Sequence, residues 1–158
     1  MKNKDAFFMR LAIEKARLGV KAGQTPFGAL IVKNNRVISC AHNLVWRNND
    51  ITAHAEVSAI RAACRKLKTI DLSEATLYST TEPCPMCFSA CHWAGIARIV
   101  YGAGIQDAKR YGFRELVISC AKMNCAGKSK IKLSAKVLLK ENLGLFDFWR
   151  AQNNHRSY

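Results

Sequence analysis

The sequence has no long apolar run, no internal repeat and no low-complexity stretch. A helix that spans a bilayer needs about 20 predominantly apolar residues, and none of the apolar stretches approaches that length. Residues 1–5 are polar, and the apolar stretch that follows them is too short and too interrupted for the core of a secretory signal peptide. We therefore expect neither a membrane protein nor an exported one.

Acidic side chains are also scarce. The 11 Asp and Glu residues stand against 25 Lys and Arg residues, which gives a formal net charge of +14 and a pI near 9.8. The excess is greatest in residues 122–158, where only Glu141 and Asp147 oppose the basic side chains. A pI above 9 is common among nucleic-acid-binding proteins. Two explanations stay open, a basic surface on an ordinary protein and a binding site for a polyanion.

The seven cysteines cannot form a complete set of disulfides, because their number is odd. So many cysteines without an export signal indicate a reducing compartment, and we expect a cytoplasmic location. Cys84 and Cys87 have the C-x-x-C spacing that suits metal binding or redox chemistry. The other cysteines are typical of small buried hydrophobic residues.

The composition, 49% hydrophobic and 23% charged, is that of a single globular domain. Apolar periodicity and turn residues predict helices over 5–22, 53–67, 85–94 and 146–153, and strands over 29–33, 37–41, 75–79, 97–101 and 115–119. Residues 123–129 are expected to form a loop, 131–139 a strand or a helix, and 122–132 is the one candidate linker. This order is typical of an α/β domain with helices packed on a central sheet.

Two short segments, 52–56 (TAHAE) and 81–87 (TEPCPMC), carry the chemistry. His54, Cys84 and Cys87 together offer one imidazole and two thiolates, which are three ligands for tetrahedral Zn²⁺ with a fourth position left for water. Glu56 lies close enough to that position to move protons without occupying it. The alternatives are a redox pair at 84 and 87, or a closed structural zinc site with Cys91 as fourth ligand. We favour the catalytic interpretation and expect Cys91 to be a packing residue.

With this H-x-E…P-C-x-x-C pattern, the chain resembles the cytidine deaminase-like superfamily of zinc deaminases, from about residue 6 to the end. The resemblance implies one deaminase domain over 1–158 with a three-layer α-β-α fold around a five-stranded mixed sheet. It implies one Zn²⁺ per subunit on His54, Cys84 and Cys87, with Glu56 as proton shuttle. It also implies that backbone amides near Ala55 and Cys84 help to hold the substrate, and that the chains form dimers or higher oligomers.

Two branches of the superfamily are nearest, the bacterial guanine deaminases and the deaminases that convert adenosine to inosine at the tRNA wobble position. Residues 26–29 (PFGA) and 92–94 (HWA) are similar to the guanine branch, and so is the tail with Phe146, Trp149 and Tyr158. In that branch residues corresponding to 143–158 form a C-terminal helix and tail that can be exchanged between subunits and can cover an active site.

This resemblance gives the expected substrate contacts. Glu115 would accept hydrogen bonds from N1–H and the 2-amino group of guanine. Phe27 and Trp93 would sandwich the purine, Asn43 would bond its ring nitrogens or O6, and Tyr158 would reach the site through the tail. From residue type alone, an ordinary alternative stays open for each of them. Glu115 could be a solvated carboxylate, and the two aromatic residues could belong to the core. Asn43 could be a turn residue, and Tyr158 a frayed terminus.

The predicted reaction is zinc-dependent hydrolysis of guanine at C2, giving xanthine and ammonia. The basic segment 122–136 and the Glu at position 115, where Asp is familiar, depart from the guanine branch. Guanosine, cytosine and another amino-heterocycle therefore stay open as substrates, as does the wobble adenosine of tRNA, which the charge favours. A different class of function is a non-catalytic, zinc-stabilised module that binds RNA or a protein partner, and Glu56 argues against it.

Overall fold

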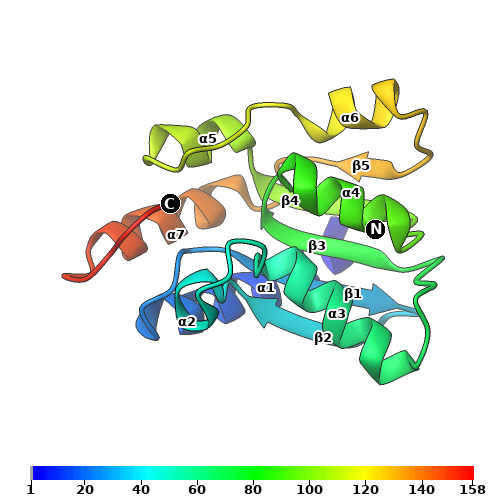
Figure 1. Cartoon of the computed structure of the whole chain (residues 1–158), viewed down its shortest axis with the longest axis horizontal. Coiled ribbons are helices and arrows are strands. Elements are labelled where there is room, and N and C mark those ends of the chain that lie inside the picture. The colour runs from blue at the N-terminus through cyan, green and yellow to red at the C-terminus, as the bar shows by residue number, and fades with distance from the viewer. Residues whose placement is uncertain (1) are drawn as a thin grey trace.

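A mixed five-stranded sheet forms the centre of the protein in the computed structural model, which describes the backbone of residues 2–158 and the side chains of residues 4–158 (Figure 1). The strands are β1 (Gly28–Lys33), β2 (Arg36–His42), β3 (Thr76–Thr81), β4 (Arg98–Ala103) and β5 (Lys132–Ser134). Their spatial order is β2-β1-β3-β4-β5. β1 runs antiparallel to β2 and β3, whereas β3, β4 and β5 are parallel. The carboxyl ends of β2, β3 and β4 therefore meet at one edge of the sheet.

Helices cover both faces of this sheet, as the sequence predicts. One face packs against α3 (Ala55–Leu67), α4 (Pro85–Trp93) and α6 (Cys120–Ala126), and the other against α1 (Lys2–Lys21) and α7 (Leu139–Arg150). Successive strand residues point to opposite faces. In β3, Leu77 joins the core under α3 and α4, while Tyr78 joins the core under α1. The period-2 apolar pattern of the strands thus produces the three-layer α-β-α architecture.

Two short helices lie at the edge where β2 and β4 end. They are α2 (Val45–Asn48), which follows β2, and α5 (Ile105–Arg110), which follows β4. α7 also reaches this edge, because Gly102 of β4 leaves room for the side chain of Asn142. A Cβ atom at Gly102 would overlap the Asn142 amide. The absence of a side chain at 102 therefore lets α7 lie close to β4.

Four predictions for the second half of the chain are wrong. Residues 115–119 do not form a strand, because the amides of Glu115 and Ile118 bond carbonyls only two residues earlier and join no ladder. The parallel partner of β4 is β5 instead. Most of the expected loop 123–129 belongs to α6, whose N-cap Ser119 accepts a hydrogen bond from the amide of Lys122. The stretch 122–132 is therefore not an unstructured linker. The closing helix begins at Leu139, earlier than the expected 146.

None of the helices in the described part of the chain is long and apolar enough to cross a membrane. None of the seven cysteines forms a disulfide bond.

Candidate metal centre and substrate cavity

Two helix N-termini meet at the edge where the parallel strands end. His54 is the residue before α3, and Cys84 is the residue before α4, directly after β3 and the short segment 82–83. Pro85 occupies the first position of α4, where its missing N–H has no intrahelical partner to lose. Crevices outside the carboxyl ends of parallel strands are the usual ligand sites of open α/β sheets. The fold thus brings the two sequence segments together at a place suited to binding.

His54, Cys84 and Cys87 form a group whose ligand atoms all lie within 4.8 Å of one another. Nδ1 of His54 is 3.7 Å from Sγ of Cys84 and 3.5 Å from Sγ of Cys87. A tetrahedral zinc ion with ordinary Zn–N and Zn–S bond lengths would separate its nitrogen and sulfur ligands by about 3.6 Å. The donor set and its spacing therefore fit zinc, and three protein ligands leave the fourth position open, as in catalytic sites.

The electrostatics of the two thiols also suit a metal. The hydrogen bond from Cys87 is the main cause that lowers the pKa of Cys84 to about 4, against the opposing effect of burial, and His54 adds to it. The pKa of Cys87 is raised, because its proton is shared with Cys84 and because the side chain is buried. The pair thus holds one thiolate at neutral pH before any cation binds. Both sulfurs become thiolates when they coordinate zinc.

Glu56 lies in the first turn of α3 and is only 6% exposed. Its Oε1 accepts a hydrogen bond from the hydroxyl of Ser79 in β3, over 3.2 Å. Burial raises the pKa of Glu56, and the nearby His54 opposes that rise. A carboxyl group in such a place can both take up and return a proton, which is the behaviour that general acid–base catalysis needs.

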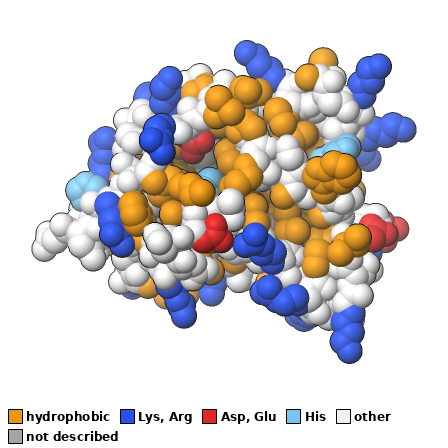
Figure 2. All heavy atoms as spheres, viewed as in Figure 1, with side chains coloured by type: hydrophobic (Ala, Val, Ile, Leu, Met, Phe, Trp, Pro, Cys, Tyr) orange, Lys and Arg blue, Asp and Glu red, His pale blue; other side chains and the backbone are white. Residues whose placement is uncertain are grey.

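A cavity of about 250 Å³ opens beside the metal group. His54 and Cys84 line it, and Phe113, Arg114, Glu115 and Tyr158 form other parts of its wall. Burial is the largest cause that raises the pKa of Glu115 to about 7. Figure 2 shows hydrophobic side chains gathered over this face of the molecule, with Lys and Arg side chains around its periphery. The loop between α5 and α6 thus brings the predicted Glu115 to the metal group.

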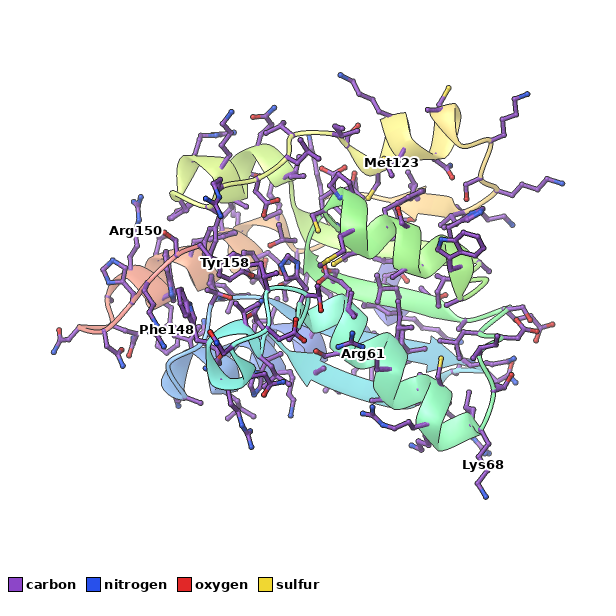
Figure 3. All side chains as sticks on the ribbon, viewed as in Figure 1. Arg61, Lys68, Met123, Phe148, Arg150 and Tyr158 are labelled. Carbon is purple, nitrogen blue, oxygen red and sulfur yellow. The ribbon has the colours of Figure 1, made fainter. Side chains whose placement is uncertain are left out.

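The predicted residues Asn43 and Tyr158 are brought together. The side-chain amide of Asn43, which is fully buried, donates a hydrogen bond to the hydroxyl of Tyr158 over 2.7 Å. The Tyr158 ring lies 5.6 Å from the imidazole of His54, and its carbonyl accepts a hydrogen bond from the amide of Arg114. Figure 3 shows Tyr158 between α7 and the start of α3. Residue 158 is therefore held at the cavity rather than frayed, and it reaches the site of its own chain.

Phe27 and Trp93 do not form the expected sandwich within the chain. Phe27 packs edge-on against Phe113 and Phe146, with ring centroids 4.8 and 5.9 Å apart, and does not line the cavity. Trp93 lies at the end of α4 and is 86% exposed. Helical spacing explains the difference, because the end of α4 is more than two turns beyond Cys84, where the cavity opens.

The remaining predicted residues lie as follows. Ala55 is buried at the first position of α3, next to the metal group. Cys91 is buried in the core and does not belong to the metal group of the described residues. The structural alternative with Cys91 as fourth ligand is therefore not supported.

Sequence reasoning missed Glu82, which is buried directly after β3. Its Oε1 accepts a hydrogen bond from the amide of Cys120 and its Oε2 one from the amide of Ile105. These bonds tie the starts of α5 and α6 to β3 and so fix the ends of the loop that carries Glu115. The proximity of Glu82 to Cys84 in sequence was the available signal. Ile51, Met86 and Leu116 also line the cavity, and no signal in the sequence singled them out.

Comparison with known proteins gives one consistent result. The family model described as the cytidine and deoxycytidylate deaminase zinc-binding region matches residues 2–103. A guanine deaminase from Bacillus subtilis (strain 168) is 39% identical over 152 residues, 96% of this chain and 97% of that protein. A tRNA-specific adenosine deaminase from Buchnera aphidicola subsp. Schizaphis graminum (strain Sg) is 34% identical over 139 residues, 88% and 89% of the two chains.

A solved structure of a guanine deaminase from Nitrosomonas europaea has a TM-score of 0.84 and 28% identity, covering 93% of this chain and 85% of that one. The sequence match, the shared fold and the His-Cys-Cys group agree with one another. The chain therefore belongs to the cytidine and deoxycytidylate deaminase family of zinc-binding deaminases.

Proposed function

We propose that the protein hydrolyses the amino group of a free purine base, and that guanine is its substrate, with xanthine and ammonia as products. The observation that carries this proposal is the position of Glu115, whose carboxyl lines the same cavity as His54 and Cys84. An ionised carboxylate can accept hydrogen bonds from two adjacent donors. N1–H and the 2-amino group of guanine are such a pair, and adenine offers no matching pair. A guanine deaminase from Bacillus subtilis is 39% identical to this chain over 96% of its length, which supports guanine as the substrate.

The proposed proton transfers use Glu56. A bound zinc ion on His54, Cys84 and Cys87 would act as a Lewis acid that makes water a nucleophile near neutral pH. Glu56 takes one proton of the attacking water and delivers it to N3 of guanine, and then carries the second proton of the same water to the departing amino group. One water molecule is consumed, the C2–N bond breaks, and ammonia leaves. The hydrogen bond from Ser79 to Oε1 keeps the Glu56 side chain in one orientation during these transfers.

The size of the cavity favours a free base. Its volume of about 250 Å³ is a little below the roughly 300–1,000 Å³ typical of pockets for drug-sized ligands. Tyr158 forms part of its wall and is held at both its hydroxyl and its carbonyl. We expect a base that is part of a folded RNA to need this residue moved aside, whereas a free purine would not.

The tRNA wobble adenosine is the second candidate. The net charge of +14 and the tRNA-specific adenosine deaminase from Buchnera aphidicola, 34% identical, both favour it. Such an enzyme must bind an anticodon arm through phosphate contacts, so its activity would fall steeply as salt rises. Guanosine and cytosine are further candidates that the same cavity chemistry admits. A non-catalytic zinc module is disfavoured, because it has no use for the buried carboxyl of Glu56.

We also propose that the protein forms a homodimer in the cytoplasm. Trp93 ends α4 and is 86% exposed, and Leu116 lines the cavity at the start of this helix and is 64% exposed. Large apolar side chains exposed along one helix are typical of protein–protein contacts. Sedimentation of the full chain would give a dimer mass, and Trp93→Glu would shift it to the monomer. A monomeric wild-type protein would contradict this proposal. Exchange of the tails between subunits stays a prediction.

Ammonia release by the zinc-loaded protein separates the candidate substrates. The substrates are guanine, guanosine, adenine, adenosine, cytosine, cytidine and an anticodon stem-loop, each at low and moderate salt. We expect turnover of guanine that salt hardly changes. Glu115→Gln should lower guanine turnover by about 100-fold or more, because an amide can accept at only one of its two polar atoms. Activity on the stem-loop alone that is lost at moderate salt would show that tRNA, and not guanine, is the substrate.

A further inference from the structure

Trp46 of the short helix α2 makes two contacts with the C-terminal tail that carries Tyr158. The indole Nε1–H of Trp46 donates a hydrogen bond to the carbonyl of Arg156 over 3.3 Å. The guanidinium carbon of Arg156 lies 4.0 Å from the centre of the Trp46 ring, in a cation–π contact. Backbone and side chain of one tail residue are thus held by one aromatic side chain. We call this pair of contacts the Trp46–Arg156 clasp.

The clasp is connected directly to the substrate cavity. The rings of Trp46 and Tyr158 meet edge-on, with centroids 6.2 Å apart. Asn43, which bonds the Tyr158 hydroxyl through Nδ2, also accepts a hydrogen bond at Oδ1 from the amide of Val45, at the start of α2. The same one-turn helix is therefore linked to Tyr158 through Asn43 and to the tail through Trp46. Its position sets the position of the tail.

The clasp lies at a second cavity. Trp46 and Arg156 line this cavity of about 600 Å³, which shares no lining residue with the substrate cavity. Tyr158 lines the substrate cavity and not the second one. The tail has few other attachments, since residues 153–157 are exposed. Without the clasp, the tail would be held in place mainly by the hydrogen bonds of Tyr158 with Asn43 and with the amide of Arg114.

We propose that Trp46 is a positioning residue for the substrate, which acts by seating the tail so that Tyr158 closes the cavity over the metal group. Trp46 does not line the substrate cavity and acts only through Arg156 and Tyr158. The part that concerns the substrate rests on the proposed deamination of a free base. The part that concerns the seating of the tail does not depend on it.

Hydrogen exchange tests the seating without any activity measurement. The amide of Arg114 donates to the carbonyl of Tyr158, so its exchange rate reports whether the tail is in place. In the zinc-loaded full chain, Trp46→Ala should speed exchange of the Arg114 amide by about tenfold. Arg17→Ala is the matched control, because it removes another cation–π contact, with Phe148, that lies on α1 and α7. Equal exchange in wild type and Trp46→Ala would overturn the proposal.

Kinetics test the consequence for the substrate. Trp46→Ala should raise KM for the base about tenfold, which is about 1.4 kcal/mol, while kcat and zinc content change little. Trp46→Phe keeps a ring for the Arg156 guanidinium and should restore part of the loss. In a Tyr158→Ala background, Trp46→Ala should have no further effect on KM, because residues that act through one another are not additive. Full additivity would overturn the positioning role.

The two failures can be told apart. If the wild-type protein releases no ammonia from any free base, the proposed function fails, and the exchange of the Arg114 amide still decides whether the clasp seats the tail. If the protein deaminates a base but Trp46→Ala leaves KM unchanged, the proposed function stands and the role of Trp46 is wrong.

Discussion

Asn43 and Tyr158, which are 115 positions apart in the sequence, are joined by a 2.7 Å hydrogen bond at the mouth of the cavity beside His54. Asn43 follows β2, and Tyr158 is reached only after α7 has returned along β4 to the same edge of the sheet. The side chain of Asn43 is fully buried, and Tyr158 lines the cavity. The bond therefore connects the end of β2 with a residue of the cavity wall.

Removal of the Tyr158 hydroxyl tests this coupling. Tyr158→Phe should lower the free energy of unfolding by about 1 kcal/mol, the usual net value of a hydrogen bond, and should raise KM for the base. Asn43→Ala should cost more, because it also leaves the amide of Val45 without its partner. Denaturant unfolding of the two single variants and the double variant measures the coupling. A double variant whose loss equals the sum of the single losses would show that the bond contributes nothing.

Zinc retention tests the metal group. Cys84→Ser and Cys87→Ser should each lose bound zinc, as measured by metal analysis of the purified protein. The melting temperature should fall with the metal, since a ligand that binds only the folded state stabilises it. Cys91→Ala is the matched control, because Cys91 is buried like Cys87 but lies outside the group of ligands. Loss of zinc from the Cys91 variant would point to a closed structural site instead.

Glu82→Gln tests the support of the loop that carries Glu115. Both carboxylate oxygens of Glu82 accept hydrogen bonds from backbone amides, and a glutamine side chain can accept only one of them. The unpaired buried amide should cost about 1–3 kcal/mol of unfolding free energy, and KM should rise as the loop loosens. The exposed Glu141 supplies the control, Glu141→Gln, which should change neither quantity. If neither variant changed the free energy of unfolding, Glu82 would not support the loop that carries Glu115.

Asp5 gives the stability a defined pH dependence. Its carboxylate accepts two hydrogen bonds from Arg98 and one from Tyr78. Burial raises its pKa, but the contacts with Arg98 and Tyr78 outweigh burial, so the pKa lies below the ordinary 3.8. A carboxyl group whose pKa is lower in the folded state stabilises the fold above its unfolded pKa, and this stability is lost as the pH falls through the folded pKa.

Asp5→Asn should therefore lower the free energy of unfolding by about 2 kcal/mol at pH 7. The difference from wild type should shrink as the pH falls below 3.8. Urea unfolding across this pH range measures it. A difference that stays constant down to the lowest pH would mean that the charge of Asp5 contributes no stability.

The metal group could be predicted from the sequence because its parts are local. His54 and Glu56 are on one turn, Cys84 and Cys87 on another, and each segment starts a helix whose position the fold then determines. The substrate contacts depend on residues that are far apart in the sequence. Phe27 and Trp93 have the right residue types, but packing against Phe113 and the length of α4 place them elsewhere. The segment 115–119 has the composition of a strand, yet β5 already occupies the edge of β4.

The Trp46–Arg156 clasp could not be predicted from the sequence either, because it also depends on tertiary packing. Trp46 lies in a stretch rich in Asn with no periodicity, and nothing local connects it with Arg156. Their contact joins residues 110 positions apart and depends on the packing of α7 against α1 and β4.

The decisive measurement is ammonia release from guanine by zinc-loaded wild type and by Glu56→Gln, with zinc content measured in both. We expect turnover by wild type and a loss of about 100-fold to 10,000-fold in Glu56→Gln, with the zinc retained, because Glu56 moves protons and does not hold the metal. Wild-type protein that holds zinc but leaves guanine intact, or a Glu56→Gln variant as active as wild type, would contradict the proposed function.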